Sequence, residues 1–213
     1  MLLPGWGFDV RVFELLDLDF NYLLPQRIDI ARFNAELITW LKREGIKEIS
    51  LFGWSMGGFL AIDFLKEYEE VVKEAFLVSM RTRFPKDQID SQRALLTEDR
   101  KLCLVQFYRN CFMGQKRAFK WFEEKLLSSY TKIFDLQSLL SGLDYMARQE
   151  LRHSILTGYP VRLIHGKKDR IAPLAEISEL MGELSSSHIL LFERSGHLPF
   201  LEPDFKERLS HGV

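Results

Sequence analysis

Apolar residues along much of the chain form short runs that alternate with segments of helical periodicity. The runs that are typical of buried strands cover residues 48–52, 74–78, 161–165 and 188–192, and a further short run at residues 20–24 ends at Pro25. Apolar side chains at three- and four-residue spacing predict helices at residues 30–41, 56–68, 173–184 and 203–209. Strands separated by helices form parallel sheets with helices on both faces. The pattern therefore predicts an α/β fold built on a mostly parallel sheet.

The stretch from residue 81 to residue 157 has a different pattern, because it is almost entirely helical and carries no clear strand. Its apolar residues form stripes at helical spacing within residues 101–113 and 115–130. We interpret residues 81–157 as a lid of amphipathic helices laid over the strand ends. Residues 1–80 and 158–213 then form the α/β core.

The length and composition of the chain point to one domain. With 213 residues, 46% of them hydrophobic, it can bury one sizeable core. No apolar run approaches the about 20 residues of a membrane span, and the first residues do not resemble a signal peptide, so we expect a soluble, cytoplasmic protein. Cys103 and Cys111 are too few for a disulfide framework and lack partners at zinc-ligand spacing. We therefore expect no metal and no cofactor.

Charge is distributed unevenly between the core and the lid. The formal net charge is −1, which argues against a nucleic-acid binder. Residues 81–157 contain 14 basic and 9 acidic residues, whereas the rest of the chain contains 15 basic and 21 acidic residues. A basic lid on an acidic core suggests an acidic partner or substrate.

The motif G-W-S-M-G at residues 53–57 lies between a predicted strand and a predicted helix. This placement is what the G-x-S-x-G nucleophile elbow requires. The tight turn accounts for the glycines and puts the serine at a helix N-terminus, whose dipole favours developing negative charge. Ser55 is therefore the predicted nucleophile. The alternative is that Ser55 only caps the helix.

A serine nucleophile needs a base, and the base needs an acid that orients it. In hydrolases with this elbow the chain order is Ser, then Asp or Glu, then His. Asp169 and His197 each follow a predicted strand, at the carboxyl ends where open sheets build their sites. They are the predicted acid and base, although Asp169 alone also fits a helix cap and His197 a structural role. The residues that fit the order or the loop placement less well are His153, His165, His188, His211, Asp63 and Asp144.

Acyl transfer also needs two N–H donors for the oxyanion. One should be the backbone N–H of Met56, the residue after the nucleophile. The glycine-rich loop L-L-P-G-W-G at residues 2–7 should supply the other from Trp6, whose indole would form a wall of the acyl pocket. The alternative is that this loop is only a turn.

Four segments of the chain together resemble the α/β-hydrolase superfamily: P-G-W-G at 4–7, G-W-S-M-G-G at 53–58, G-K-K-D at 166–169 and S-G-H-L-P-F at 195–200. Within it, nearly the whole chain is similar to the methyl ester carboxylesterases that act on pimeloyl-acyl-carrier protein in biotin synthesis. The residues on either side of Ser55 carry this likeness, as do the phenylalanine-containing helix ending at residues 111–114 and the run at residues 142–152. The sequence departs from the family at Pro4 and Glu150, where histidine and aspartate are usual, and it lacks the strands that normally precede the Trp6 loop.

The resemblance implies hydrolysis of a methyl ester on a pimeloyl chain carried by acyl carrier protein. It assigns Ser55, Asp169 and His197 to a catalytic triad and Trp6 and Met56 to the oxyanion hole. It also implies that Phe107 contacts the acyl chain. The family docks its acidic carrier through arginines of the lid, and the nearby basic residues here are Arg109, Lys116, Arg117 and Lys120.

Two other hypotheses remain open at this stage. The protein is either a carboxylesterase for small molecules, in which the charge of the lid is incidental, or a binding module that has the hydrolase fold without catalysis.

Overall fold

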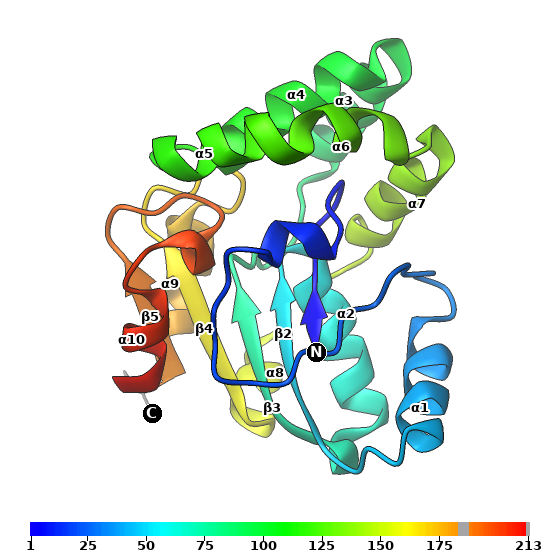
Figure 1. The fold of residues 1–213 in the computed structure, drawn as a ribbon, viewed down its shortest axis with the longest axis vertical. Helices are drawn as coiled ribbons and strands as arrows, with labels where there is room; N and C mark the ends of the chain where they lie inside the picture. Colours follow the sequence, from blue (N-terminus) through cyan, green and yellow to red (C-terminus); the bar gives the residue numbers. More distant parts are fainter. Residues whose placement is uncertain (183–187, 212–213) are drawn as a thin grey trace.

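A sheet of parallel strands lies at the centre of the molecule (Figure 1), which confirms the predicted α/β fold. The computed structural model describes residues 1–182 and 188–211. Within these residues the strands are β1 (Leu2–Leu3), β2 (Ile49–Trp54), β3 (Val72–Val78), β4 (Val161–Gly166) and β5 (Ile189–Phe192), paired side by side in chain order. Every pair is parallel. The carboxyl ends of all described strands therefore meet at one edge of the sheet.

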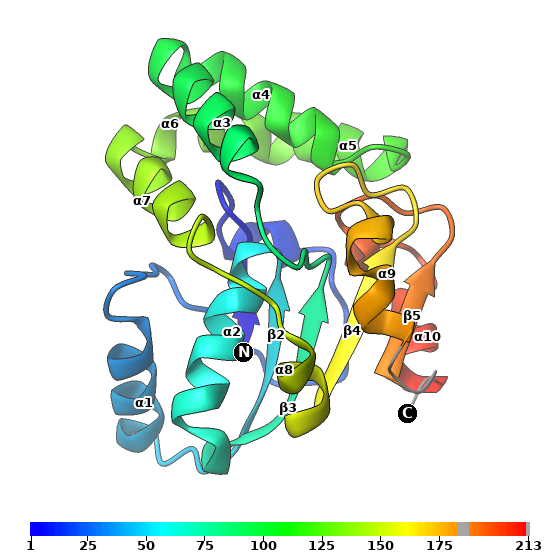
Figure 2. The same cartoon turned by 180° about the vertical axis from the view of Figure 1, so that it is seen from behind.

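Both faces of the sheet are covered, because side chains alternate along each strand. Ile49 and Leu51 of β2 belong to a buried cluster on one face. The helices that contribute to this cluster are α1 (Phe33–Arg43), α2 (Met56–Glu67), α8 (His153–Gly158) and α9 (Leu174–Gly182), as seen from behind in Figure 2. Phe52 and Trp54 belong to the cluster on the other face, with the short helix η1 (Val10–Phe13) and with α10 (Phe205–His211). Because both faces are buried, the strands read as nearly continuous apolar runs.

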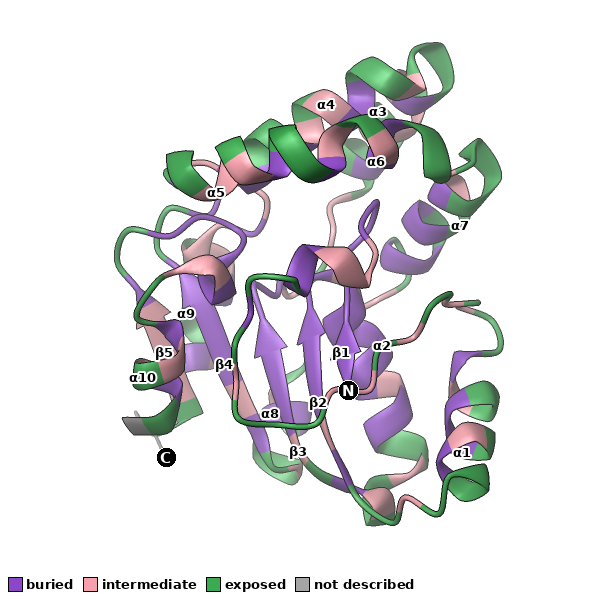
Figure 3. Cartoon of the chain, viewed as in Figure 1, coloured by how far each residue is buried: buried purple, intermediate pink, exposed green. Residues whose placement is uncertain are grey.

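A layer of helices lies across the carboxyl ends of the strands and forms the predicted helical insertion (Figure 1). Its elements are α3 (Lys86–Glu98), α4 (Arg100–Cys111), α5 (Lys116–Phe122), the π-helical turn η3 (Glu123–Leu127), α6 (Ser128–Ile133) and α7 (Leu136–Met146). Its outward surface is largely exposed, whereas the strands below are buried (Figure 3). The exact limits of the lid, residues 81 and 157, stay a prediction.

Several predicted elements differ in detail from the structure. The first helix begins at Phe33 instead of residue 30, because the Asp29 carboxylate accepts a hydrogen bond from the Ala31 N–H (3.0 Å) and forms a turn there. Residues 20–24 form no strand; the Leu23 carbonyl accepts one hydrogen bond from the Leu2 N–H (3.1 Å). The last helix begins at Phe205 instead of residue 203. Helix α9 is described to residue 182, so its predicted end at residue 184 lies outside the described residues.

Within residues 1–182 and 188–211, none of the helices is both long enough and apolar enough to cross a bilayer.

Candidate active site

Ser55 occupies the sharp turn between β2 and α2 with a φ of 54°, in the left-handed region that residues with a side chain rarely adopt. Such a conformation costs about 1–3 kcal/mol and persists where the surrounding structure enforces it. The Ser55 N–H donates to the Val78 carbonyl (2.8 Å), and the Ser55 carbonyl accepts from the Gly58 N–H (2.9 Å). A Cβ at Gly57 would lie 2.2 Å from the Leu3 carbonyl oxygen, so the close approach of β1 requires glycine. The serine is thus held between the end of β2 and the N-terminus of α2.

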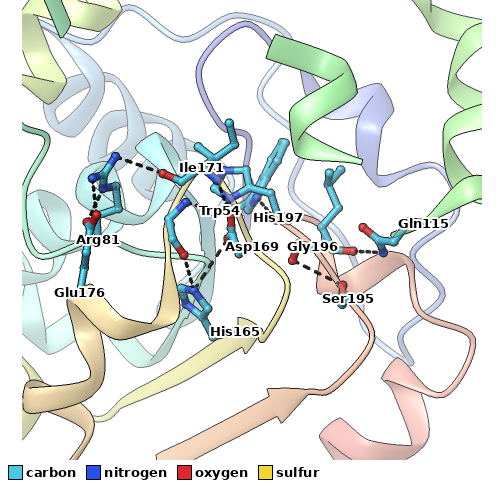
Figure 4. A network of polar contacts seen from close by, with 12 residues as sticks. Trp54, Arg81, Gln115, His165, Asp169, Ile171, Glu176, Ser195, Gly196 and His197 are labelled. Atoms are coloured by element: carbon cyan, nitrogen blue, oxygen red, sulfur yellow. Dashed lines mark hydrogen bonds and ion pairs between the residues drawn. The ribbon is translucent and has the colours of Figure 1, made fainter. Parts of the chain in front are cut away.

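Asp169 and His197 lie in the loops that follow β4 and β5, and the structure brings them into contact (Figure 4). His197 Nδ1 is 2.7 Å from Asp169 Oδ2, and both side chains are buried. The other carboxylate oxygen accepts from the N–H groups of Ile171 and Ala172, each at 2.8 Å. A carboxylate at Nδ1 favours the tautomer with its proton there, which leaves Nε2 able to act as a base. His197 Nε2 is buried and has no hydrogen-bond partner within the described residues.

Ser55 therefore makes no hydrogen bond to His197 Nε2 in this structure. The neighbouring residue, Trp54, instead holds the loop that carries His197. The Trp54 indole Nε1–H donates to the His197 carbonyl (2.7 Å), and the two rings lie 5.3 Å apart (Figure 4). The loop of the predicted base is thus attached to the turn that holds the predicted nucleophile. The contact between serine and histidine stays a prediction.

The lid also holds the histidine loop. The His197 N–H donates to the Cys111 carbonyl at the end of α4 (3.1 Å). The Gln115 side-chain amide donates to the Leu198 carbonyl (2.8 Å). Both contacts lie in a buried region, so the position of the predicted base depends on the lid as well as on the core.

The loop that carries Trp6 is held to the lid by side-chain hydrogen bonds. We call residues 4–9 the oxyanion loop after the role that is predicted for Trp6. The Trp6 indole donates to the Leu139 carbonyl of α7 (2.8 Å). The Tyr108 hydroxyl of α4 donates to the Gly7 carbonyl (2.7 Å). A third bond runs from the Tyr130 hydroxyl of α6 to the Asp9 carboxylate (2.7 Å). Sequence reasoning missed Tyr130 and placed Tyr108 on an apolar stripe without indicating the partner of its hydroxyl.

A cavity of about 140 Å³ opens beside Ser55 between the core and the lid. Trp6 and Phe107 line it, with their rings 4.9 Å apart in an edge-to-face arrangement. The other lining residues are Arg81, Phe84, Gln88, Ile89, Gln92, Leu143, Met146, Arg170 and Ile171. Met56 does not line this cavity but a second one, which is also lined by residues of the oxyanion loop. Because Met56 is the first residue of α2, its backbone N–H has no acceptor within the helix.

Two residues that sequence reasoning did not assign to the site form hydrogen bonds to the loop that holds Asp169 (Figure 4). His165 donates from Nε2 to the Ala172 carbonyl (2.7 Å) and lies 3.8 Å from Asp169 Oδ2. Burial lowers the pKa of His165 below its ordinary 6.5, partly opposed by the Asp169 charge, so this imidazole is neutral. Arg81 donates to both carboxylate oxygens of Glu176 (2.8 and 2.7 Å) and to the Ile171 carbonyl (3.1 Å). No local sequence signal marks the role of Arg81 at the acid's loop, because Ile171 and Glu176 lie 90 and 95 residues away along the chain.

The basic residues predicted to dock a carrier lie exposed on α4 and α5: Arg109, Lys116, Arg117 and Lys120. Lys120 forms a loose, exposed ion pair with Glu124 (3.9 Å). Exposed pairs of this kind are weak, so these side chains stay available to a partner. Their docking role stays a prediction. Within the described residues, no group of three or more His, Cys, Asp or Glu side chains gathers as a metal site.

Comparisons with known proteins agree with this architecture. The sequence matches the alpha/beta hydrolase family over residues 2–205. It is 25% identical to the pimeloyl-[acyl-carrier protein] methyl ester esterase of Vibrio vulnificus strain CMCP6, over 96% of this chain and 89% of that protein. Among solved structures it is similar to an esterase from Exiguobacterium antarcticum (TM-score 0.75, 19% identity, 99% of this chain and 88% of that one). It is also similar to a bromoperoxidase from Bacillus anthracis (TM-score 0.78, 16% identity, 99% and 90%). At these identities, the similarity to the two structures supports the fold alone.

Proposed function

Because the chain belongs to the α/β-hydrolase family, we propose that it is a serine esterase in which Ser55 is the nucleophile, His197 the general base and Asp169 the orienting acid. The observation that carries the proposal is the buried Asp169–His197 pair at 2.7 Å, which leaves His197 Nε2 without a partner among residues 1–182 and 188–211. An unpartnered buried base is costly unless a reacting group pairs with it. In this proposal the reacting group is the Ser55 hydroxyl, because Ser55 follows Trp54, whose indole donates to the His197 carbonyl.

The proposed reaction proceeds in two steps. His197 Nε2 takes the Ser55 proton as the serine oxygen attacks the ester carbonyl, and the backbone N–H groups of Met56 and Trp6 stabilise the oxyanion. The carbonyl then re-forms, the alcohol leaves with the proton from His197, and an acyl-serine remains. Water attacks this ester, again giving its proton to His197, and the acid is released with Ser55 restored. Asp169 holds the imidazole tautomer and stabilises its charged form.

Turnover of p-nitrophenyl butyrate tests this proposal. Ser55→Ala should lose about 10⁴- to 10⁶-fold in kcat, and Asp169→Asn about 10⁴-fold. A fluorophosphonate probe should label Ser55, as read by peptide mass spectrometry. Ser178→Ala is the matched control, since that exposed hydroxyl donates to the Ala175 carbonyl within α9 (2.7 Å) and to no other group among residues 1–182 and 188–211. A purified wild-type protein that neither turns over activated esters nor takes the label would instead support the binding-module hypothesis.

We further propose that the natural ester is a methyl ester on a pimeloyl chain linked to acyl carrier protein. The names of the distant relatives support this substrate, and so do the exposed cations of α4 and α5, which would attract an acidic carrier. The test is kcat/KM on carrier-linked and free methyl pimelate across a salt series. We expect a preference for the carrier-linked ester that falls as salt rises and falls again in Lys116→Glu/Arg117→Glu. Equal kcat/KM on both substrates at every salt concentration would favour the small-molecule carboxylesterase.

A further inference from the structure

The cavity beside Ser55 is apolar on most sides but has a wall of hydrogen-bond donors. Arg81, Gln88, Gln92 and Arg170 contribute to this wall, and no aspartate or glutamate is among the described residues that line the cavity. Gln88 and Arg170 are exposed beside the cavity, whereas Arg81 and Gln92 already donate to protein groups. A wholly apolar acyl chain offers no acceptor to the two exposed donors, whereas a substrate with an acceptor at its far end can pair with them.

Arg81 is not the free donor of this wall, because every nitrogen of its guanidinium already donates to a group of the protein. Its charge is balanced by the carboxylate of Glu176, 2.7 Å away. Its Nη1 donates to the Gln88 side-chain oxygen (2.7 Å), which fixes the orientation of that amide. The NH₂ group of Gln88 is then left as a donor, with no partner among residues 1–182 and 188–211.

Arg170 is the residue of this wall whose charge is uncompensated. It is exposed, follows Asp169 directly, and makes no hydrogen bond or ion pair with any described residue. Asp169 cannot neutralise it, because both carboxylate oxygens are occupied by His197, Ile171 and Ala172. A guanidinium binds carboxylate oxygens in a bidentate manner, so a free one at the wall of a substrate cavity is suited to an anionic oxygen group.

We propose that Arg170, assisted by the Gln88 amide, binds the second carboxyl group of a dicarboxylic acyl chain whose ester end lies at Ser55. This specificity rests on the esterase function proposed above. A cavity of about 150 Å³ holds a benzene molecule, so this one takes roughly six non-hydrogen atoms. That is about the size of a glutaryl or adipyl chain beyond its reacting carbonyl carbon, so the far end of the longer pimeloyl chain would extend out of the cavity. A free carboxylate and a far thioester or ester carbonyl share this acceptor chemistry, with the carboxylate bound more strongly because it is charged.

Three methyl esters of equal chain length test the proposal: monomethyl adipate, dimethyl adipate and methyl hexanoate. The measured quantity is the ratio of kcat/KM for each adipate to kcat/KM for methyl hexanoate. The wild-type protein should favour monomethyl adipate, and Arg170→Gln should lower that ratio about 10- to 100-fold, mainly through KM. Arg170→Lys should retain part of it, and the ratio for dimethyl adipate should fall less.

Arg148→Gln is the matched control, because Arg148 is exposed just after α7 and does not line the cavity. Unchanged ratios in Arg170→Gln, or a wild-type preference for methyl hexanoate, would overturn the specificity while leaving the esterase proposal intact. A general loss of activity through disturbance of Asp169 lowers all three rates together and leaves the ratios unchanged, so it also counts against the specificity. A wild-type protein that hydrolyses none of the esters would instead point to failure of the esterase function.

Discussion

The hydrogen bond from the Tyr108 hydroxyl to the Gly7 carbonyl is one of the contacts through which the lid holds the backbone of the predicted oxyanion hole. Tyr108→Phe removes only the hydroxyl. The ring keeps its neighbours, with Phe8 at 4.9 Å and Phe122 at 5.0 Å between centroids. The Gly7 carbonyl then loses its donor in a buried region, which should cost about 1–3 kcal/mol of folding free energy.

The effect on catalysis should exceed what stability alone explains. Gly7 has a φ of 70° and follows Trp6, so a shift of its carbonyl moves the Trp6 N–H that is expected to stabilise the oxyanion. Complete loss of one oxyanion donor costs about 10²- to 10³-fold in kcat. Because the bonds to Leu139 and Tyr130 remain, we expect a smaller loss, about 10-fold in kcat with KM little changed.

The assays are urea unfolding followed by circular dichroism and steady-state kinetics with p-nitrophenyl butyrate. Tyr145→Phe is the matched control, because its hydroxyl donates to the Asp63 carboxylate of α2 (2.6 Å) away from the oxyanion loop. That variant should lose at least as much stability, since its acceptor is charged, yet keep kcat. The reasoning is refuted if Tyr108→Phe is destabilised as expected but retains full kcat, or if both variants lose kcat equally.

Three further outcomes follow from the packing and the buried titratable groups. Gly57→Ala should lose about 1–3 kcal/mol or more of stability in urea unfolding, because the new Cβ would lie 2.2 Å from the Leu3 carbonyl oxygen; full stability would contradict the close approach. Burial raises the pKa of Cys103 to about 11 and that of Cys111 well above 9.0, so neither thiol should react with Ellman's reagent at pH 8 until urea is added. Burial lowers the pKa of His165, so the unfolded chain binds a proton there more readily; stability should fall as pH drops below about 6.5, with a smaller slope in His165→Asn.

Much of the predicted site follows from local sequence. The apolar run before Ser55 and the helical periodicity after it predict a strand, a turn and a helix, and glycine at 57 leaves room for the close approach of β1. Asp169 and His197 were assigned because each follows a predicted strand, and parallel strands bring their carboxyl ends to one edge. The structure places these two side chains in contact at 2.7 Å.

Other features of the site depend on elements far apart in the sequence. Periodicity places Tyr108 on a buried stripe, but its hydroxyl reaches Gly7 only because α4 packs over the oxyanion loop, 101 positions away. The same holds for the Trp54 indole and the His197 carbonyl, which are 143 positions apart. Arg170 appears in the sequence as one more surface charge, and its place on the cavity wall depends on how the lid meets the core.

The sequence alone thus determined the order of strands and helices, the nucleophile turn and the loops that hold the candidate acid and base. These features rest on the alternation of side chains within single elements, which is a local property of the chain. The tertiary structure decided which side-chain donors bond to which backbone carbonyls and which charged residues line the cavity. Those contacts depend on how separate elements pack against one another.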